Sequence, residues 1–224
     1  MTDYTTVHDI KAQPNITGTQ DDLVIQALIT AASAAIDRYC NRPDGFQAAA
    51  AATTRYFTGT GKYYLFVDEF ATASGLAVAV KDSATDDEDE YETWTVGTVG
   101  TTTDADVFPA TGDPRTPTYN RTPYTMLVIG PNADNATVFT DGRLENGPGL
   151  PTVKVTARWG YATTCPAQIA QATIIQVCRW LARGQSKWAD TLGNAETGTL
   201  EYRKALDPDL KMILSLGGFV RPVV

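Results

Sequence analysis

The residues that decide the fold are 153–184, VKVTARWGYATTCPAQIAQATIIQVCRWLARG, because the spacing of their apolar side chains changes halfway along. From Val153 to Trp159, apolar and polar residues alternate, as in a strand with one buried face. After Pro166, apolar residues recur every three or four positions, as on one face of a helix. Proline suits the first position of a helix, and Gly184 suits its end. The stretch therefore predicts a strand followed closely by a helix.

Before this stretch, residues 53–161 contain short runs rich in Thr, Val, Tyr and Trp, the residue types that strands favour. Turn-forming residues separate the runs, and no helical spacing interrupts them. We expect an antiparallel β insertion with a long irregular loop over Thr98–Pro123. The expected strands are Arg55–Thr58, Tyr63–Val67, Ala77–Lys81, Tyr91–Val96, Tyr124–Ile129, Ala136–Thr140 and Val153–Trp159.

Helical spacing also appears near both ends of the chain. An alanine-rich helix is expected over Gln20–Asn41, with Thr19 as its N-cap. Its apolar stripe comprises Ile25, Ile29, Ala32, Ile36, Tyr39 and Cys40, widened by Val24, Leu28, Ala31 and Ala35. Further helices are expected at Thr6–Ala12 and from Asp207 to Gly217, with a loop over Gln185–Thr199.

Together these elements predict an α+β fold, in which a small helical core carries a large antiparallel β insertion. Residues 1–45 and 160–218 form the predicted core, residues 46–159 the insertion, and residues 219–224 an extended tail. A chain of 224 residues is long enough to bury such cores without disulfides or metals.

Charge and hydropathy exclude several classes of function. The formal net charge is −8, which opposes a grip on nucleic acid, since phosphate binding relies on Lys and Arg. No run of about 18 apolar residues is present, and no signal peptide is recognisable. Cys40, Cys165 and Cys178 match no metal or redox spacing and are expected to be reduced thiols. We expect no cofactor and no metal.

Three motifs could carry chemistry, and each has a simpler interpretation. His8 is the single histidine, so a nucleophile–histidine pair would have to use it. The acidic residues from Asp86 to Glu90, with Glu92, could bind a cation, but they lack the glycine of a calcium loop and resemble a solvated hairpin tip. Gly59-Thr60-Gly61-Lys62 is too short for a phosphate loop and is interpreted as a turn. The sequence predicts no catalytic site.

Two segments are candidates for contacts with partners. Trp188 lies in a loop near Lys187 and Arg183, where it serves either a partner or subunit contact or local packing. The apolar C-terminal tail is either a frayed end or a docking segment, and the docking hypothesis assigns partner binding to Phe219, Val220, Arg221, Pro222, Val223 and Val224. A minor alternative is a carbohydrate-binding or hydrolytic β domain that uses Trp94 and the acidic residues.

Three segments resemble the head-to-tail connector (adaptor or head completion) proteins of tailed bacteriophages. The first runs from Asp21-Asp22-Leu23-Val24-Ile25 through Ala35-Ile36-Asp37-Arg38-Tyr39 to Asn41-Arg42, like the first long helix of the family. The second is the strand, loop and helix from Val155-Thr156-Ala157-Arg158-Trp159 to Arg179-Trp180-Leu181. The third, Leu206-Asp207-Pro208-Asp209-Leu210, is similar to the last helix. The large insertion departs from the family's often shorter pattern.

The resemblance implies a structural virion protein that is assembled in the host cytoplasm and located at the neck. It implies a ring of about twelve copies beneath the portal protein, which extends the DNA channel and meets a downstream neck, stopper or tail protein. DNA would pass through such a ring without specific binding. The alternatives left open are another neck or tail-completion protein and a capsid accessory protein.

Overall fold

A computed structural model describes residues 2–13, 21–84, 87, 90–98, 104–119, 121–133, 137–143, 149–185, 191–194, 198–201 and 206–221. The fold is α+β, as predicted, with four helices and two four-stranded antiparallel sheets among these residues. The chain divides into a helical unit, residues 1–47 and 165–224, and a β unit, residues 48–164.

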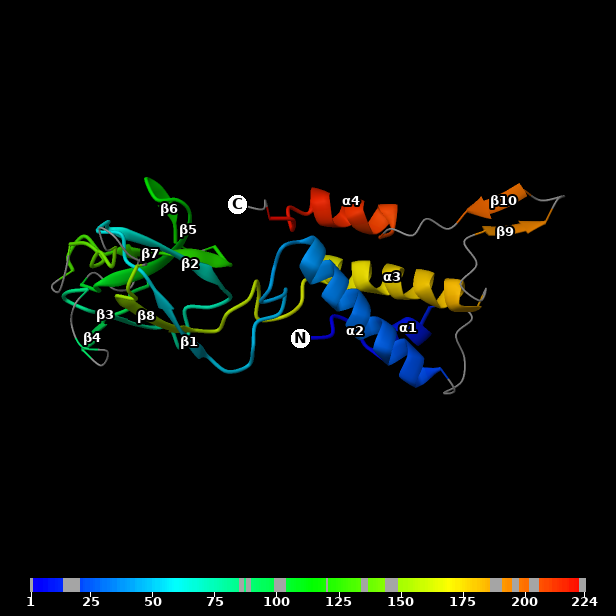
Figure 1. Ribbon diagram of the computed structural model, residues 1–224, viewed down its shortest axis with the longest axis horizontal. Helices are drawn as coiled ribbons and strands as arrows, with labels where there is room; N and C mark the ends of the chain where they lie inside the picture. Colours follow the sequence, from blue (N-terminus) through cyan, green and yellow to red (C-terminus); the bar gives the residue numbers. More distant parts are fainter. Residues whose placement is uncertain are drawn as a thin grey trace. The chain divides into compact units, whose positions relative to one another are not determined.

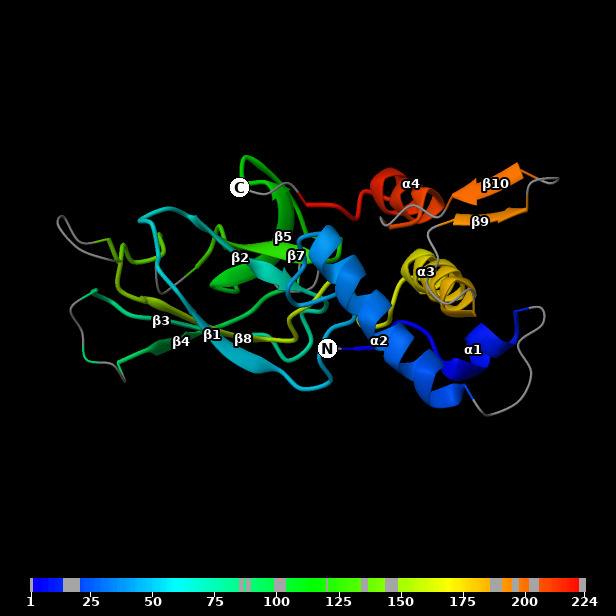
Figure 2. The same ribbon diagram turned by 45° about the vertical axis from the view of Figure 1, so that its right-hand side comes forward.

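The β unit contains two antiparallel sheets, with strand orders β1-β8-β3-β4 and β2-β7-β5-β6 (Figure 2). The strong alternation in β8 places Val153, Val155 and Ala157 in the interior, while Lys154 and Thr156 face outward. The strands are β1 Thr53–Phe57, β2 Tyr64–Phe70, β3 Ala77–Val80, β4 Glu92–Trp94, β5 Val107–Asp113, β6 Thr116–Thr118, β7 Tyr124–Ile129 and β8 Val153–Ala157.

A large hydrophobic core inside the β unit draws on both sheets, and a smaller buried cluster contains Ala110, Met126 and Val128. Trp94 from β4 is only 5% exposed, and its ring lies against Phe139, with centroids 5.4 Å apart. Trp159 is equally buried, and its indole N–H donates to the Thr53 carbonyl oxygen over 2.8 Å. Because buried aromatic rings contribute large apolar areas, these two tryptophans hold the core together rather than serve a surface site.

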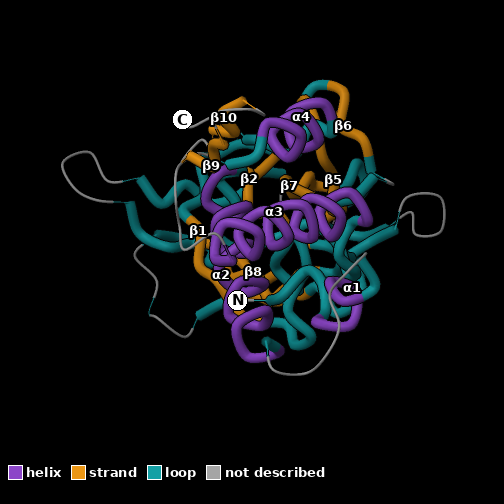
Figure 3. The backbone as a smooth tube through the Cα atoms, turned by 90° about the vertical axis from the view of Figure 1, so that its right-hand side faces the viewer, coloured by secondary structure: helices purple, strands orange, loops and turns teal. Residues whose placement is uncertain are grey.

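The helical unit is arranged around α3, which contacts the other three helices (Figures 1 and 3). Its helices are α1 Val7–Lys11, α2 Asp22–Tyr39, α3 Ala167–Gln185 and α4 Pro208–Leu216, and the short strands β9 Thr191–Asn194 and β10 Gly198–Glu201 pair with each other. The core between α1, α2 and α3 contains Ile10, Ile25, Ile29, Ala32 and Val177. The predicted buried stripe of α2 is confirmed at Ile25, Ile29, Ala32, Ile36 and Cys40.

The sequence predictions were wrong in several places. Thr98–Pro123 is not an irregular loop, because β5 and β6 lie within it. Pro109 is tolerated because its stretch of β5 pairs with β7 on one side, while β6 joins further along from Thr111. Residues 137–140 form no strand, although Phe139 is buried. The predicted loop over 185–199 contains β9 and the start of β10.

The first long helix also differs from its prediction at two points. Val24 and Ala31, which were expected to widen the buried stripe, are exposed, so the buried face is narrower than predicted. The structure gives Asp21 as the N-cap, and the predicted cap Thr19 lies outside the described residues.

The start of α4 is fixed to α3 by Asp207. Its carboxylate accepts from the Asp209 backbone N–H over 2.9 Å and forms an ion pair with Arg179. Its own N–H donates to the Gln176 side-chain oxygen over 3.1 Å. Burial raises the pKa of Asp207, but the hydrogen bonds and charge of Arg179 outweigh that effect and hold the pKa below its ordinary value.

We therefore expect Asp207→Ala to lower the free energy of unfolding by about 1–2 kcal/mol, because it removes a helix cap and an ion pair together. Urea denaturation followed by circular dichroism measures this loss. Asp209→Asn, an exposed first-turn change, serves as the matched control and should cost only a few tenths of that amount. Equal losses in the two variants would contradict this role of Asp207.

Candidate functional site

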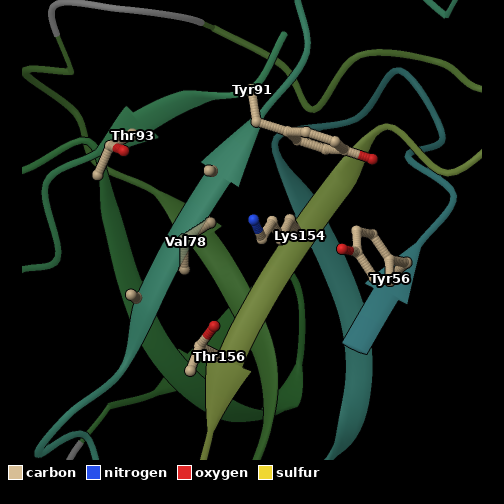
Figure 4. A pocket seen from close by; sticks show the side chains of 8 residues that line it. Tyr56, Val78, Tyr91, Thr93, Lys154 and Thr156 are labelled. Atoms are coloured by element: carbon tan, nitrogen blue, oxygen red, sulfur yellow. The ribbon is translucent and has the colours of Figure 1, made fainter. Parts of the chain in front are cut away.

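A groove of about 330 Å³ lies on the outer face of the β1-β8-β3-β4 sheet (Figure 4). The side chains of Tyr56 and Tyr91 border it, and Lys154 lies beside both. It is lined by Tyr56, Ala77, Val78, Ala79, Tyr91, Thr93, Lys154 and Thr156.

The groove follows from the register of four strands. Tyr56 on β1 pairs with Lys154 on β8, Lys154 pairs with Ala79 on β3, and Ala79 pairs with Thr93 on β4. Directly paired residues face the same side of a sheet, so these four side chains form one row. Two small alanines, Ala77 and Ala79, lie between bulkier neighbours and therefore leave a hollow.

The polar atoms around the groove are donors and hydroxyl groups. The Tyr56 and Tyr91 ring centroids are 6.1 Å apart, and the Lys154 ammonium lies 5.9 Å from the Tyr91 centroid. The Tyr91 hydroxyl donates to the Pro151 carbonyl over 3.0 Å, which fixes that ring. None of the described lining residues is a carboxylate, histidine or cysteine, so this arrangement suits binding and lacks an acid–base pair.

A second cluster fixes the C-terminal segment within the helical unit. Phe219 is only 4% exposed, and its ring meets Phe46 edge to face, with centroids 5.5 Å apart. The Arg42 guanidinium donates to the Phe219 carbonyl over 2.8 Å and lies over the Phe46 ring. The Arg221 N–H donates to the Cys40 carbonyl over 3.1 Å. The beginning of the predicted tail is therefore packed within its own unit.

Tyr4 extends this cluster to the N-terminus. Its hydroxyl donates to the Asp37 carboxylate over 2.5 Å and accepts from the Phe46 N–H over 2.8 Å. Gly45 has a φ of +72°, and a Cβ there would lie 2.6 Å from the Tyr4 hydroxyl oxygen, so glycine is required. Burial raises the pKa of Asp37, although the hydrogen bond from Tyr4 opposes that shift.

Two exposed apolar areas lie on the helical unit. On α2, Leu23 is 86% exposed, and Val24 beside it is also exposed. On α4, Met212 is exposed and Leu216, one turn later, is 82% exposed, although Leu210 and Leu214 already fill the inner face. A helix with apolar residues on both faces is typical of one that is buried on both sides in an assembly.

The predicted catalytic candidates do not come together. His8 is exposed on α1, and the neighbouring Asp9 carboxylate serves in a capping box with Thr6. Gly59-Thr60-Gly61-Lys62 joins β1 and β2 as a turn, as predicted, and Gly61 has a φ of +67°. Trp94 points into the core, so the proposed sugar site at Trp94 was wrong.

Parts of the other predicted sites lie outside the described residues. Of the acidic run, Asp87 and Glu90 are described and exposed, whereas Asp86, Glu88 and Asp89 are not described. Arg183 lies in the last turn of α3, and Lys187 and Trp188 are outside the description. Of the tail, Phe219 is buried, Val220 is exposed and Arg221 is half-buried, while Pro222, Val223 and Val224 are outside it.

The described part of the chain contains no group of three or more His, Cys, Asp or Glu side chains able to hold a metal ion. Within it, no helix combines the length and apolar character needed to cross a bilayer. The cysteines are free, and burial raises the pKa of Cys40 and of Cys165 to about 11, which keeps both as thiols.

Comparison with known proteins gives one family. Residues 3–110 match the model of the family described as head completion protein. This match includes about half of the β unit, so the insertion is not wholly foreign to the family pattern. It confirms the predicted resemblance to phage head-to-tail connectors and supports a structural role.

A chain from the solved structure described as "Neck of empty GTA particle computed with C6 symmetry" is also similar. It shares 14% identity with this chain, with 87% of this chain and 83% of that chain covered, at a TM-score of 0.42. No curated protein matched the chain in sequence.

The raised pKa of Asp37 predicts a pH dependence. Because the folded-state pKa lies above the unfolded one, this group favours folding at acidic pH, and its contribution falls as pH rises through the folded pKa. Asp37→Asn keeps an acceptor for Tyr4 without the charge, so its stability relative to wild type should increase from about pH 4 to about pH 7. Urea unfolding at a series of pH values measures this difference.

The exposed Asp82→Asn in the β unit is the control and should follow the wild-type profile. If the Asp37→Asn profile also runs parallel to wild type, the titration of Asp37 is not coupled to folding.

Proposed function

Because its first half matches the head completion protein family, we propose that the chain forms a ring adaptor at the head–tail junction of a tailed phage or phage-like particle. In this proposal about twelve copies close a ring below the portal, extend the DNA channel and present a platform to the next neck or tail protein. The observation that carries it is the family match over residues 3–110.

The exposed apolar residues of the helical unit support self-assembly. A closed ring requires two different complementary patches on each subunit, repeated by rotation. The α2 patch of Leu23 and Val24 and the α4 patch of Met212 and Leu216 lie on different helices of one unit. Each leaves a large apolar side chain in water in the isolated subunit, a cost that a neighbouring copy would remove.

The C-terminal segment supports a contact with the portal, but through fewer residues than the sequence predicted. Phe219 is committed to the subunit's own core, so it anchors the segment rather than meeting a partner. Docking on the portal is therefore assigned to the residues after it, beginning with the exposed Val220 and continuing to Val224. Arg183, Lys187 and Trp188 remain predicted contacts with a partner or a neighbouring subunit.

The net charge of −8 suits a channel through which DNA moves. Summed around a ring, acidic subunits repel phosphate groups and offer no sequence-specific grip. Such repulsion suits the wall of a channel and does not suit a protein that binds DNA tightly.

A location elsewhere in the particle is the competing proposal. Virions whose copy of this protein carries a small label should show it at the neck by electron microscopy. A label distributed over the capsid shell would favour a capsid accessory protein.

We expect the double substitution Met212→Glu and Leu216→Glu to prevent ring formation, because each buried side chain contributes about 1.5–3 kcal/mol per interface and carboxylates resist burial. Mass photometry of the purified protein, alone and with portal rings, measures the assembly. Val138→Glu adds the same charge at an exposed valine outside α4 and is the matched control. Rings that persist in the double variant would exclude α4 from the interface.

Portal binding is tested by combining Val220→Asp with removal of residues 222–224, which leaves Phe219 in place. We expect portal binding to fall at least tenfold, a change of about 1.4 kcal/mol, without loss of stability. Val138→Asp changes a comparably exposed valine in the β unit and should leave binding unchanged. Co-sedimentation with portal rings reads the result, and undiminished binding would reject the tail as the docking segment.

A further inference from the structure

The contacts proposed above for the neck role use the helical unit, and they leave the groove on the β1-β8-β3-β4 sheet unassigned. We propose that it binds a neutral sugar ring of a glycan, stacked on the exposed ring of Tyr56 and hydrogen-bonded by Lys154. At about 330 Å³ the groove lies at the small end of ligand pockets, so it suits a compact cyclic ligand.

The exposed Tyr56 ring offers an apolar surface on which the apolar face of a sugar can stack. Tyr56 is 57% exposed on a sheet face, at the position paired with Lys154. The half-buried Tyr91 ring contacts Tyr56, with centroids 6.1 Å apart, and its hydroxyl donates to the Pro151 carbonyl, so Tyr91 supports the Tyr56 ring before any ligand arrives. Exposed, pre-ordered aromatic rings mark binding surfaces rather than cores.

The polar groups match the hydroxyl rim of a sugar. The Lys154 ammonium offers three donors and lies beside the two tyrosine side chains (Figure 4). Thr93 and Thr156 add hydroxyls that both donate and accept, and Thr156 is oriented by a 2.7 Å contact with Thr54. A ligand with an apolar face and alternating hydroxyls satisfies both sets of groups.

The surroundings disfavour anionic ligands. Glu90 and Glu92 are exposed on either side of Tyr91 in the sequence, and Asp87 is exposed just before them. Glu92 lies on the Trp94 side of β4, away from the groove, but the net charge of −8 repels a phosphate chain, so a nucleic acid is disfavoured despite Lys154. The floor of Ala77 and Ala79 lets a flat ring approach the sheet, because larger side chains there would fill the hollow.

Sugar binding at this groove differs from the earlier hypothesis at Trp94. Trp94 and Thr93 are neighbours on β4, but successive residues of a strand face opposite sides of the sheet. Trp94 therefore belongs to the core, and Thr93 faces the groove.

The test titrates the full chain with cellohexaose, maltohexaose and chitohexaose and follows backbone amide signals by NMR. At least one sugar should shift amides near Ala79, Thr93 and Lys154 at millimolar concentration. Tyr56→Ala should weaken that binding about tenfold through loss of ring stacking, and Lys154→Gln should weaken it severalfold. Tyr63→Ala, an exposed tyrosine outside the groove, is the control and should bind normally.

Circular dichroism and thermal unfolding confirm that each variant is folded. The proposal is overturned if none of the three sugars shifts these amides, or if Tyr56→Ala and Lys154→Gln bind as wild type does. It is equally overturned if a proline-rich peptide or ATP shifts the same amides while the sugars do not. These outcomes leave the neck role untouched, because that role is read from ring assembly and portal binding.

Discussion

The helical unit depends on contacts that join its two distant halves. The chain leaves this unit after residue 47 and returns at residue 165, so nothing local holds α2 and α3 together. The apolar interface of α2 with α3 and the Arg42–Phe219 hydrogen bond must do so. Loop-closure entropy grows only with the logarithm of loop length, so a long insertion costs little more than a short one. This is why such a unit tolerates a whole β unit in its middle.

The fold was predictable wherever one physical pattern dominates. The period of two in β8 and the helical stripe in α3 each follow from burial of a single face, and both elements begin within a residue or two of their predicted positions. Prediction failed where the pattern is interrupted. Pro109 hid β5, because proline usually argues against a strand, whereas here the strand pairs on only one side at that point and does not need the missing N–H. The exposure of Val24 depends on which elements pack around α2, and the spacing of residues along the helix does not predict that packing.

The candidate sites depend on information that spacing along the chain does not carry. The groove combines residues from β1, β3, β4 and β8, and only the register between these strands places Tyr56, Lys154 and Thr93 in one row. The alternation of apolar and polar residues from Val153 to Trp159 predicted that Lys154 faces outward, but it did not predict that small alanines on β3 would leave a hollow beside it. Likewise, the apolar tail was recognised as a segment that needs burial, whereas its partner, Phe46, lies far away in the sequence.

The two ends of the β unit are joined to each other by a hydrogen bond, from the Ala48 N–H to the Ala162 carbonyl over 2.8 Å. A unit whose first and last residues lie side by side can be inserted or replaced as a whole, because the rest of the chain then has to connect only two neighbouring points. Lineages can thus enlarge, trim or replace this unit without rebuilding the helices, and diversity among relatives should concentrate there. Selection on the outer sheet can then act separately from selection on the assembly machinery.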